Sequence, residues 1–301
     1  MIRKICVSVA LLVTLMPVLY AVDAPAPVAT QKPVPVIAEY VIDTEHSGSQ
    51  ANWVTGQLEA VGIAYSVQRG EAGMIQARMA AVTIMTREAR MAFAAMPVDG
   101  DATLDTAGQT PELQALAEAT LTSLTIIDEN WDNRKGIYTI VGVLPLYGLS
   151  GATNLGAKLV SPVINLPQPE TLALSNATPR GFTTFFDPKK NFTGVIIDGD
   201  DVLLTPCLFP RVFRFDAIEL LGPQQWNTNN IATGPVRYAA NLREAKAAHM
   251  GGERPLILKA QGTLKRAYPV LNLDDSWLLY REWTKTELSK TGPIIITLGK
   301  R

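Results

Sequence analysis

Cysteine and histidine are scarce in this chain. Its 301 residues include 2 Cys and 2 His, which is too few for a zinc module built from these ligands. Cys6 lies at the start of an N-terminal apolar run, before the place that a lipid-anchored cysteine would take. Without that segment only Cys207 remains, so no internal disulfide is possible. We therefore expect stability to come from core packing, with Cys207 as a small buried hydrophobic residue.

An excess of one charge is also absent. Lys and Arg number 27 against 28 Asp and Glu, and charged residues make up 18% of the chain. This balance excludes the basic surface typical of nucleic-acid binding. The chain also lacks a nucleophile elbow, a Walker loop, a dinucleotide fingerprint and a zincin motif. We predict neither an enzyme nor a cofactor or metal, while the 47% hydrophobic residues are enough for a packed core.

The first segment has the pattern of a secretory signal peptide, over residues 1–21. Arg3 and Lys4 precede an apolar run that is shorter than the roughly 20 residues of a membrane span. Small residues at Ala21 and Ala24 offer two cleavage positions. The sequence therefore predicts a periplasmic or extracellular protein that contacts the membrane only through its signal, the alternative being an uncleaved anchor.

Changes in composition divide the rest of the chain. We expect a Pro-rich linker and loop at residues 22–50, an N-terminal α+β domain at 51–150, a connecting segment at 151–191 and a C-terminal mixed α/β domain at 192–301. The predicted fold class is α+β, with two mixed layers. Their element orders are β-α-α-β-β in the first and β-β-α-β-α-β in the second.

A long helix over residues 69–96 is the clearest element of the first layer, and Pro97 ends it. Apolar residues recur along it at steps of three and four, which predicts that they face the core. This stripe contains Ile75, Met79, Val82, Ala89, Phe93 and Met96.

The other elements of the first layer are shorter. Period-two alternation predicts a strand over residues 52–65, and Pro111 marks the first position of a second helix that runs to Leu121. Strands over 124–129 and 136–146 follow, with residues 130–135 as the hairpin turn between them.

In the second layer the strands are apolar runs and the helices are short. We expect strands at 192–198, 203–215, 255–260 and 293–298, and helices at 241–250 and 273–288. Two prolines, Pro206 and Pro210, place the second strand at a sheet edge or a bulge.

Few side chains in this chain suggest chemistry. The Asp198–Asp201 segment has acids suited to calcium, but apolar residues follow at once and a turn explains it better. Asp274, Asp275 and His249 have no evident catalytic partner. Among the five Trp residues, we single out Trp131, in the predicted turn, and Trp226 as possible ligand or interface residues, because exposed Trp often lies at such places.

Several short motifs resemble one bacterial envelope family. The segment Asn52–Gly56 is similar to its N-W-x-x-G strand, and Val141–Gly148 to its V-x-V-x-x-P-L-x-G strand. The segments Thr193–Asp198 and Leu204–Val212 resemble its T-G-L-x-x-D and L-x-P-x-x-x-P-R-V patterns. The family is the one grouped with the twenty-kilodalton surface lipoprotein and the flagellar assembly protein T. In this chain Ile84 replaces an acid of the family's long helix.

The resemblance implies a secreted, mixed α/β protein of envelope or flagellar assemblies, and it carries no catalytic residue over. Our leading hypothesis is a non-enzymatic structural or interaction protein. It would assemble with itself or with other envelope proteins through a sheet edge or a helix face. The alternative is a periplasmic module that binds a glycan or another small molecule.

Overall fold

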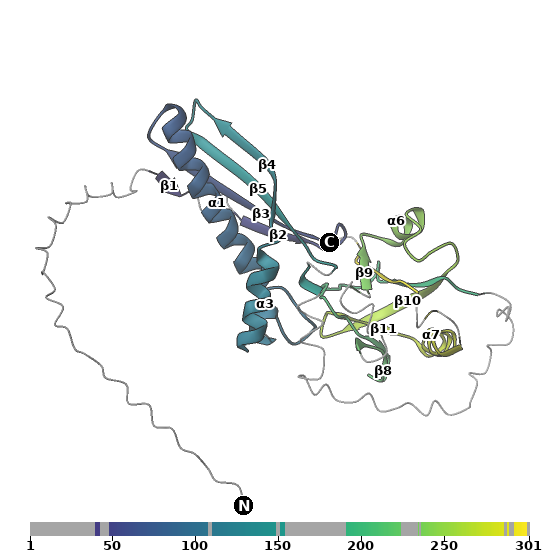
Figure 1. Ribbon diagram of the computed structural model, residues 1–301. Coiled ribbons are helices and arrows are strands. Elements are labelled where there is room, and N and C mark those ends of the chain that lie inside the picture. Colours follow the sequence, from purple (N-terminus) through teal and green to yellow (C-terminus); the bar gives the residue numbers. More distant parts are fainter. Residues whose placement is uncertain are drawn as a thin grey trace, which may run out of the picture. The chain divides into compact units, whose positions relative to one another are not determined.

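Two β-sheets and the helices that cover them make up an α+β fold (Figure 1). The computed structural model describes residues 40–42, 48–107, 110–148, 151–153, 191–223, 234, 236–285, 288 and 292–299. The predicted signal, most of the predicted linker and connecting segment, and Trp226 lie outside the described residues.

The first sheet is antiparallel throughout. Its strands are β1 (Tyr40–Ile42), β2 (Gly48–Asn52), β3 (Gln57–Ser66), β4 (Thr125–Asp132) and β5 (Ile137–Pro145). Their order is β1-β3-β5-β4, with β2 also paired to β3. Along β3 and β5 buried residues alternate with more exposed ones, as expected for a sheet that is covered on one face.

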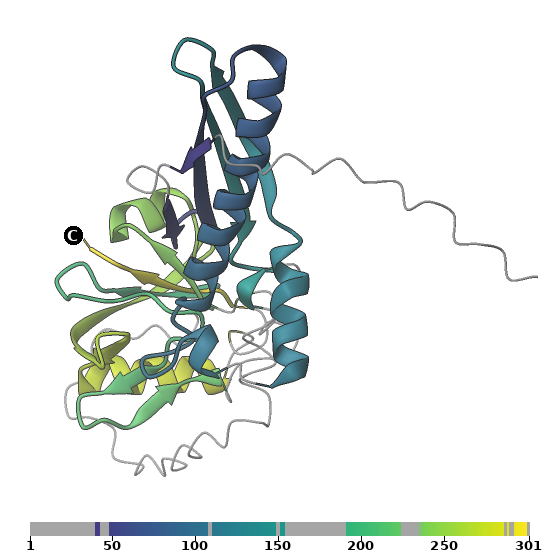
Figure 2. The same cartoon turned by 90° about the vertical axis from the view of Figure 1, so that its left-hand side faces the viewer.

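Helix α1 (Gly70–Ala94) covers that face, as both views of the molecule show (Figures 1 and 2). Its sheet-facing side is formed by small residues such as Ala77 and Ala81, which let the backbone approach the strands closely. A Cβ atom at Gly62 of β3 would overlap the Ala81 carbonyl oxygen, and one at Gly142 of β5 would overlap the Met85 sulfur. These two glycines therefore set the depth at which the helix sits.

The predicted apolar stripe of this helix is wrong in its first half. Ile75 and Met79 are 49% and 64% exposed, whereas Ala89, Phe93 and Met96 are buried as expected. The buried side of the first turns is instead formed by glycine and alanine. Hydrophobicity alone selected the larger residues, but the close approach to the sheet favours the smaller ones.

Two short helices, α2 (Leu104–Ala107) and α3 (Pro111–Leu121), lead from α1 to the second hairpin. Helix α3 has the predicted bounds. The β4–β5 turn occupies residues 133–136 and not 130–135, because β4 continues to Asp132. The strand predicted over residues 52–65 likewise begins later, as β3, since residues 53–56 form the turn between β2 and β3.

The second sheet has the order β8-β7-β11-β10-β6-β12-β9. Its strands are β6 (Gly194–Asp198), β7 (Val212–Arg214), β8 (Glu219–Leu221), β9 (Val236–Ala239), β10 (Pro255–Leu264), β11 (Tyr268–Leu271) and β12 (Ile294–Thr297). The pairs β10–β6, β6–β12 and β12–β9 are parallel. Its helices are α6 (Leu242–Ala247) and α7 (Leu273–Lys285).

Both faces of the parallel strands are buried. Ile196 and Ile295 pack with Ala245 of α6 on one face. Val195, Ile197, Ile294 and Ile296 belong to the main core cluster, which also holds Leu279 and Trp283 of α7. This double cover explains why β6 and β12 are continuous apolar runs in the sequence.

The predicted element order of the second layer needs correction. The single strand predicted at 203–215 is an irregular segment that ends in β7, and β8, β9 and β11 were not predicted. Pro206 and Pro210 lie in the irregular part, where no ladder hydrogen bond is lost.

Candidate functional site

We predicted Trp131 in an exposed turn, but the structure does not place it there. It lies in β4 opposite Tyr138, with ring centroids 6.0 Å apart. The indole is half-buried and packs against the cluster between α1 and the first sheet. Trp131 therefore fills a structural position, and it no longer supports a ligand site at this hairpin.

An ion pair near Trp131 links α1 to β4. The Arg78 guanidinium donates to both carboxylate oxygens of Glu129 at 2.7 Å, and the Tyr138 hydroxyl donates to the same carboxylate at 2.7 Å. The Arg78 hydrogen bond lowers the pKa of Glu129 to about 2. The three side chains thus link α1, β4 and β5.

The acids that follow β6 hold a turn together. Asp200 accepts hydrogen bonds from the Thr297 hydroxyl at 2.5 Å and from the Leu242 amide at 3.0 Å. Asp201 pairs with Lys259 at 2.6 Å, and Asp198 accepts from the Asp200 amide. The predicted turn is thus present at the carboxyl ends of β6 and β12. Within the described part of the chain, no three Cys, His or acidic residues are grouped as metal ligands.

Cys207 is buried, as predicted, and its backbone is held on both sides by one tyrosine. The Tyr238 hydroxyl accepts from the Cys207 amide at 3.0 Å and donates to its carbonyl at 2.9 Å. Burial raises the pKa of the thiol to about 12, so the sulfur remains protonated and a poor nucleophile at neutral pH. His249 is exposed in the turn after α6, and Asp275 accepts from the Lys259 amide.

Residues of the family-like motifs meet where the core clusters of the two sheets join. The Trp53 and Tyr238 rings make an edge-to-face contact with centroids 5.7 Å apart. The Tyr147 ring lies under the Arg237 guanidinium at 4.1 Å, and a Cβ atom at Gly56 would overlap that ring. These motif residues serve packing and offer no reactive group.

The outer side of α1 is an exposed apolar surface. Ile75, Met79, Val82 and Thr86 follow one another at steps of four, three and four along α1. Ile75, Met79 and Thr86 are exposed, whereas Val82 packs against the cluster between α1 and the first sheet. We call these four residues the outer strip. Val82 is half-buried, whereas Ile75 and Met79 are largely exposed. Neighbouring apolar side chains on a helix face are typical of protein interfaces.

Strand β4 is an edge of the first sheet in the described residues, and its form disfavours strand addition. Its register against β5 shifts between Ile126 and Asp128, which places Ile127 in a bulge. Asp128 and Glu129 follow the bulge along the exposed part of the strand. Bulges and charges are common protection against edge-to-edge pairing. Of the two surfaces that we considered from the sequence, the helix face is therefore the better candidate.

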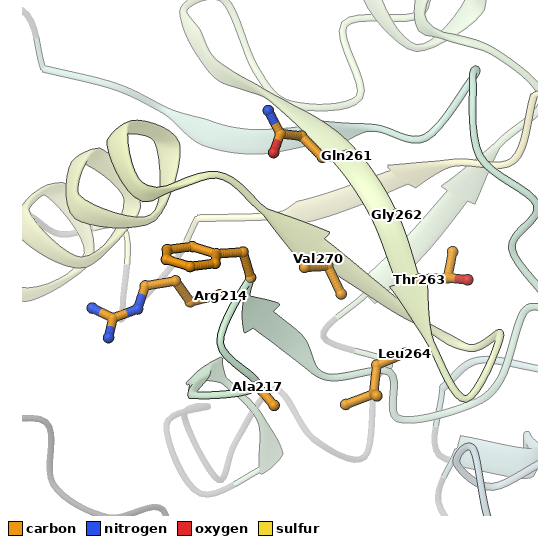
Figure 3. A pocket seen from close by; sticks show the side chains of 8 residues that line it. Arg214, Ala217, Gln261, Gly262, Thr263, Leu264 and Val270 are labelled. Atoms are coloured by element: carbon orange, nitrogen blue, oxygen red, sulfur yellow. The ribbon is translucent and has the colours of Figure 1, made fainter.

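A pocket of about 380 Å³ opens between β7, β10 and β11 (Figure 3). Arg214 and Ala217 lie on one side and Gln261–Leu264 on the other, with Val270 of β11 between them. Phe215 is also part of the lining. This site was not predicted from the sequence, because its walls come from segments about fifty residues apart. The exposed Phe215 before a tight turn was the local signal that was available.

The C-terminal part of the chain matches a known bacterial domain. Residues 194–300 fit the family model described as Treponema pallidum Tp0624, second domain. None of the curated proteins matches the chain. In the described residues, no helix combines the length and the apolar character that a membrane span requires.

Proposed function

We propose that this chain is an exported, non-enzymatic interaction protein of the bacterial cell envelope. It assembles there with itself or with another envelope protein. The predicted signal at residues 1–21 supports export, and the match of residues 194–300 to a Treponema pallidum domain supports a bacterial origin. The motif similarities support the finer relation to the surface lipoprotein and flagellar assembly protein T group.

The outer strip of α1 is the observation that carries this proposal. Ile75 and Met79 remain exposed although alanine fills the buried side of the same helix. Burying one such side chain against a partner contributes about 1.5–3 kcal/mol. Ile75 and Met79 together supply apolar area that a partner can cover at the centre of a contact.

Site-specific photocrosslinking in the native host tests the proposal. A photoreactive amino acid placed at position 79 should give a discrete crosslinked product, which mass spectrometry identifies. The same amino acid at position 91 is the matched control, since Met91 is also exposed on α1 but lies outside the outer strip. Light scattering on the purified chain shows whether the partner is a second copy. A monomer without any product at position 79 contradicts the proposed function.

A further inference from the structure

The pocket in the second sheet has the character of a neutral, partly apolar binding site. Val270, Leu264 and Gly262 belong to its lining, and we call these three residues its floor. Phe215, another lining residue, is 62% exposed. Among the described residues that line the pocket there is no Asp, Glu, Lys or His. Arg214, a charged residue of this lining, binds Asp216 through both carboxylate oxygens, at 2.7 and 2.5 Å. That pairing neutralises the guanidinium and disfavours an anionic ligand.

A β-bulge brings a polar side chain to the rim of this pocket. The register of β10 against β11 passes from Ala260 to Gly262, so Gln261 is the extra residue. Bulges redirect side chains and are enriched next to functional sites. The Gln261 amide offers two donors and an acceptor, the groups that hydrogen-bond sugar hydroxyls. In Figure 3 the Thr263 side chain points away from Val270, so we give it no role.

The space above the floor is kept open by Gly262. A Cβ atom there would meet nothing within 4 Å, and the residue is absent from the positive-φ glycines. Backbone conformation therefore does not require glycine at this position. Next to the pocket, Ala217 adopts a φ of 63°, a left-handed conformation that is strained for alanine. Such strain persists where the surrounding structure fixes it, and it is enriched at ligand sites.

We propose that this pocket binds a neutral sugar ring. The apolar face of the ring stacks on Phe215 and on the floor, while the Gln261 amide binds hydroxyls at its edge. An open, neutral hollow suits one ring of a longer glycan, because the neighbouring rings extend into solvent. This site is independent of the outer strip of α1, so either proposal can fail without the other.

Titration of the purified chain with maltotriose, cellotriose and chitotriose tests the assignment by saturation-transfer NMR and calorimetry. At least one should bind with a dissociation constant of about 1 mM, as expected for an open site. Phe215→Ala should weaken binding about five- to tenfold through loss of the aromatic contact. Gly262→Phe should abolish binding, because its ring fills the hollow. Leu203→Ala is the matched control, since Leu203 is equally exposed at 66% and lies outside the pocket lining.

Unchanged melting temperatures are required for each variant, and Gly262→Ala serves as a milder second substitution if Gly262→Phe unfolds the chain. Absence of binding by all three sugars at about 10 mM overturns the proposal. Binding that survives both Phe215→Ala and the Gly262 substitutions also overturns it.

Discussion

The two sheets bury their strands in different ways. In β3 and β5 every second residue faces α1 and the others are more exposed, whereas β6 and β12 are buried on both faces between core clusters. The first sheet thus depends on one closely fitted helix with small residues at the contact. The second depends on large aliphatic side chains. The same kind of substitution should therefore have unequal consequences in the two regions.

The largest expected effect is the loss of a side chain from the doubly covered strands. Ile296→Ala should lower the free energy of unfolding by about 3–4 kcal/mol, because it leaves a cavity in the main core. Val141→Ala, on the face of the first sheet away from α1, should cost about 1 kcal/mol or less. Urea unfolding followed by circular dichroism measures both. Equal losses would remove the distinction between the two sheets.

Adding a methyl group should instead destabilise the first sheet more than the second. Gly62→Ala should destabilise the protein by about 2 kcal/mol, because the new Cβ overlaps the Ala81 carbonyl oxygen and pushes α1 outward. Gly262→Ala in the second sheet should change stability by less than about 0.5 kcal/mol, since its Cβ enters open space. The same denaturation experiment decides, and a tolerated Gly62→Ala would mean that α1 adapts easily.

The smallest expected effect is the pH dependence that one ion pair gives to the first sheet. The pKa of Glu129 is lowered from 4.5 to about 2 by Arg78, so its contribution is complete above pH 4.5 and is lost as pH falls toward 2. Melting temperatures of the original chain and of Glu129→Gln should converge over that range. Since the pair is exposed, the difference at neutral pH should be small. A constant difference from pH 6 to pH 2 would contradict the assignment.

Local signals in the sequence were enough for several elements. Pro111 marked the start of α3, and period-two alternation marked β3 as a half-buried strand. Two hairpin turns share one signal that could have placed them correctly. Asn52 and Asp132 each cap a turn with their side-chain oxygen, and a glycine with positive φ follows four residues later, at Gly56 and Gly136.

Other features depend on tertiary contacts that no local pattern carries. Strand β11 contains Pro269, which argues against a central strand, but pairing with β7 begins only at Val270, so Pro269 lies outside that ladder. The inward side of α1 was mistaken because glycines in β3 and β5 decide it. The pocket could not be predicted either, since Phe215 and Gly262 become neighbours only through β11.

One segment supplies hydrogen-bond acceptors across the chain: the carbonyls of Pro97 and Val98 accept from the amides of Leu208 and Phe209 at 3.0 and 2.9 Å. A fragment limited to the bacterial domain match would lose both acceptors. It would also expose main-core leucines that otherwise pack with Leu58 and Leu144. We expect such a fragment, expressed by itself, to aggregate. The domain that matches the family model therefore needs the upstream part of the chain as a stabilising component of its own fold.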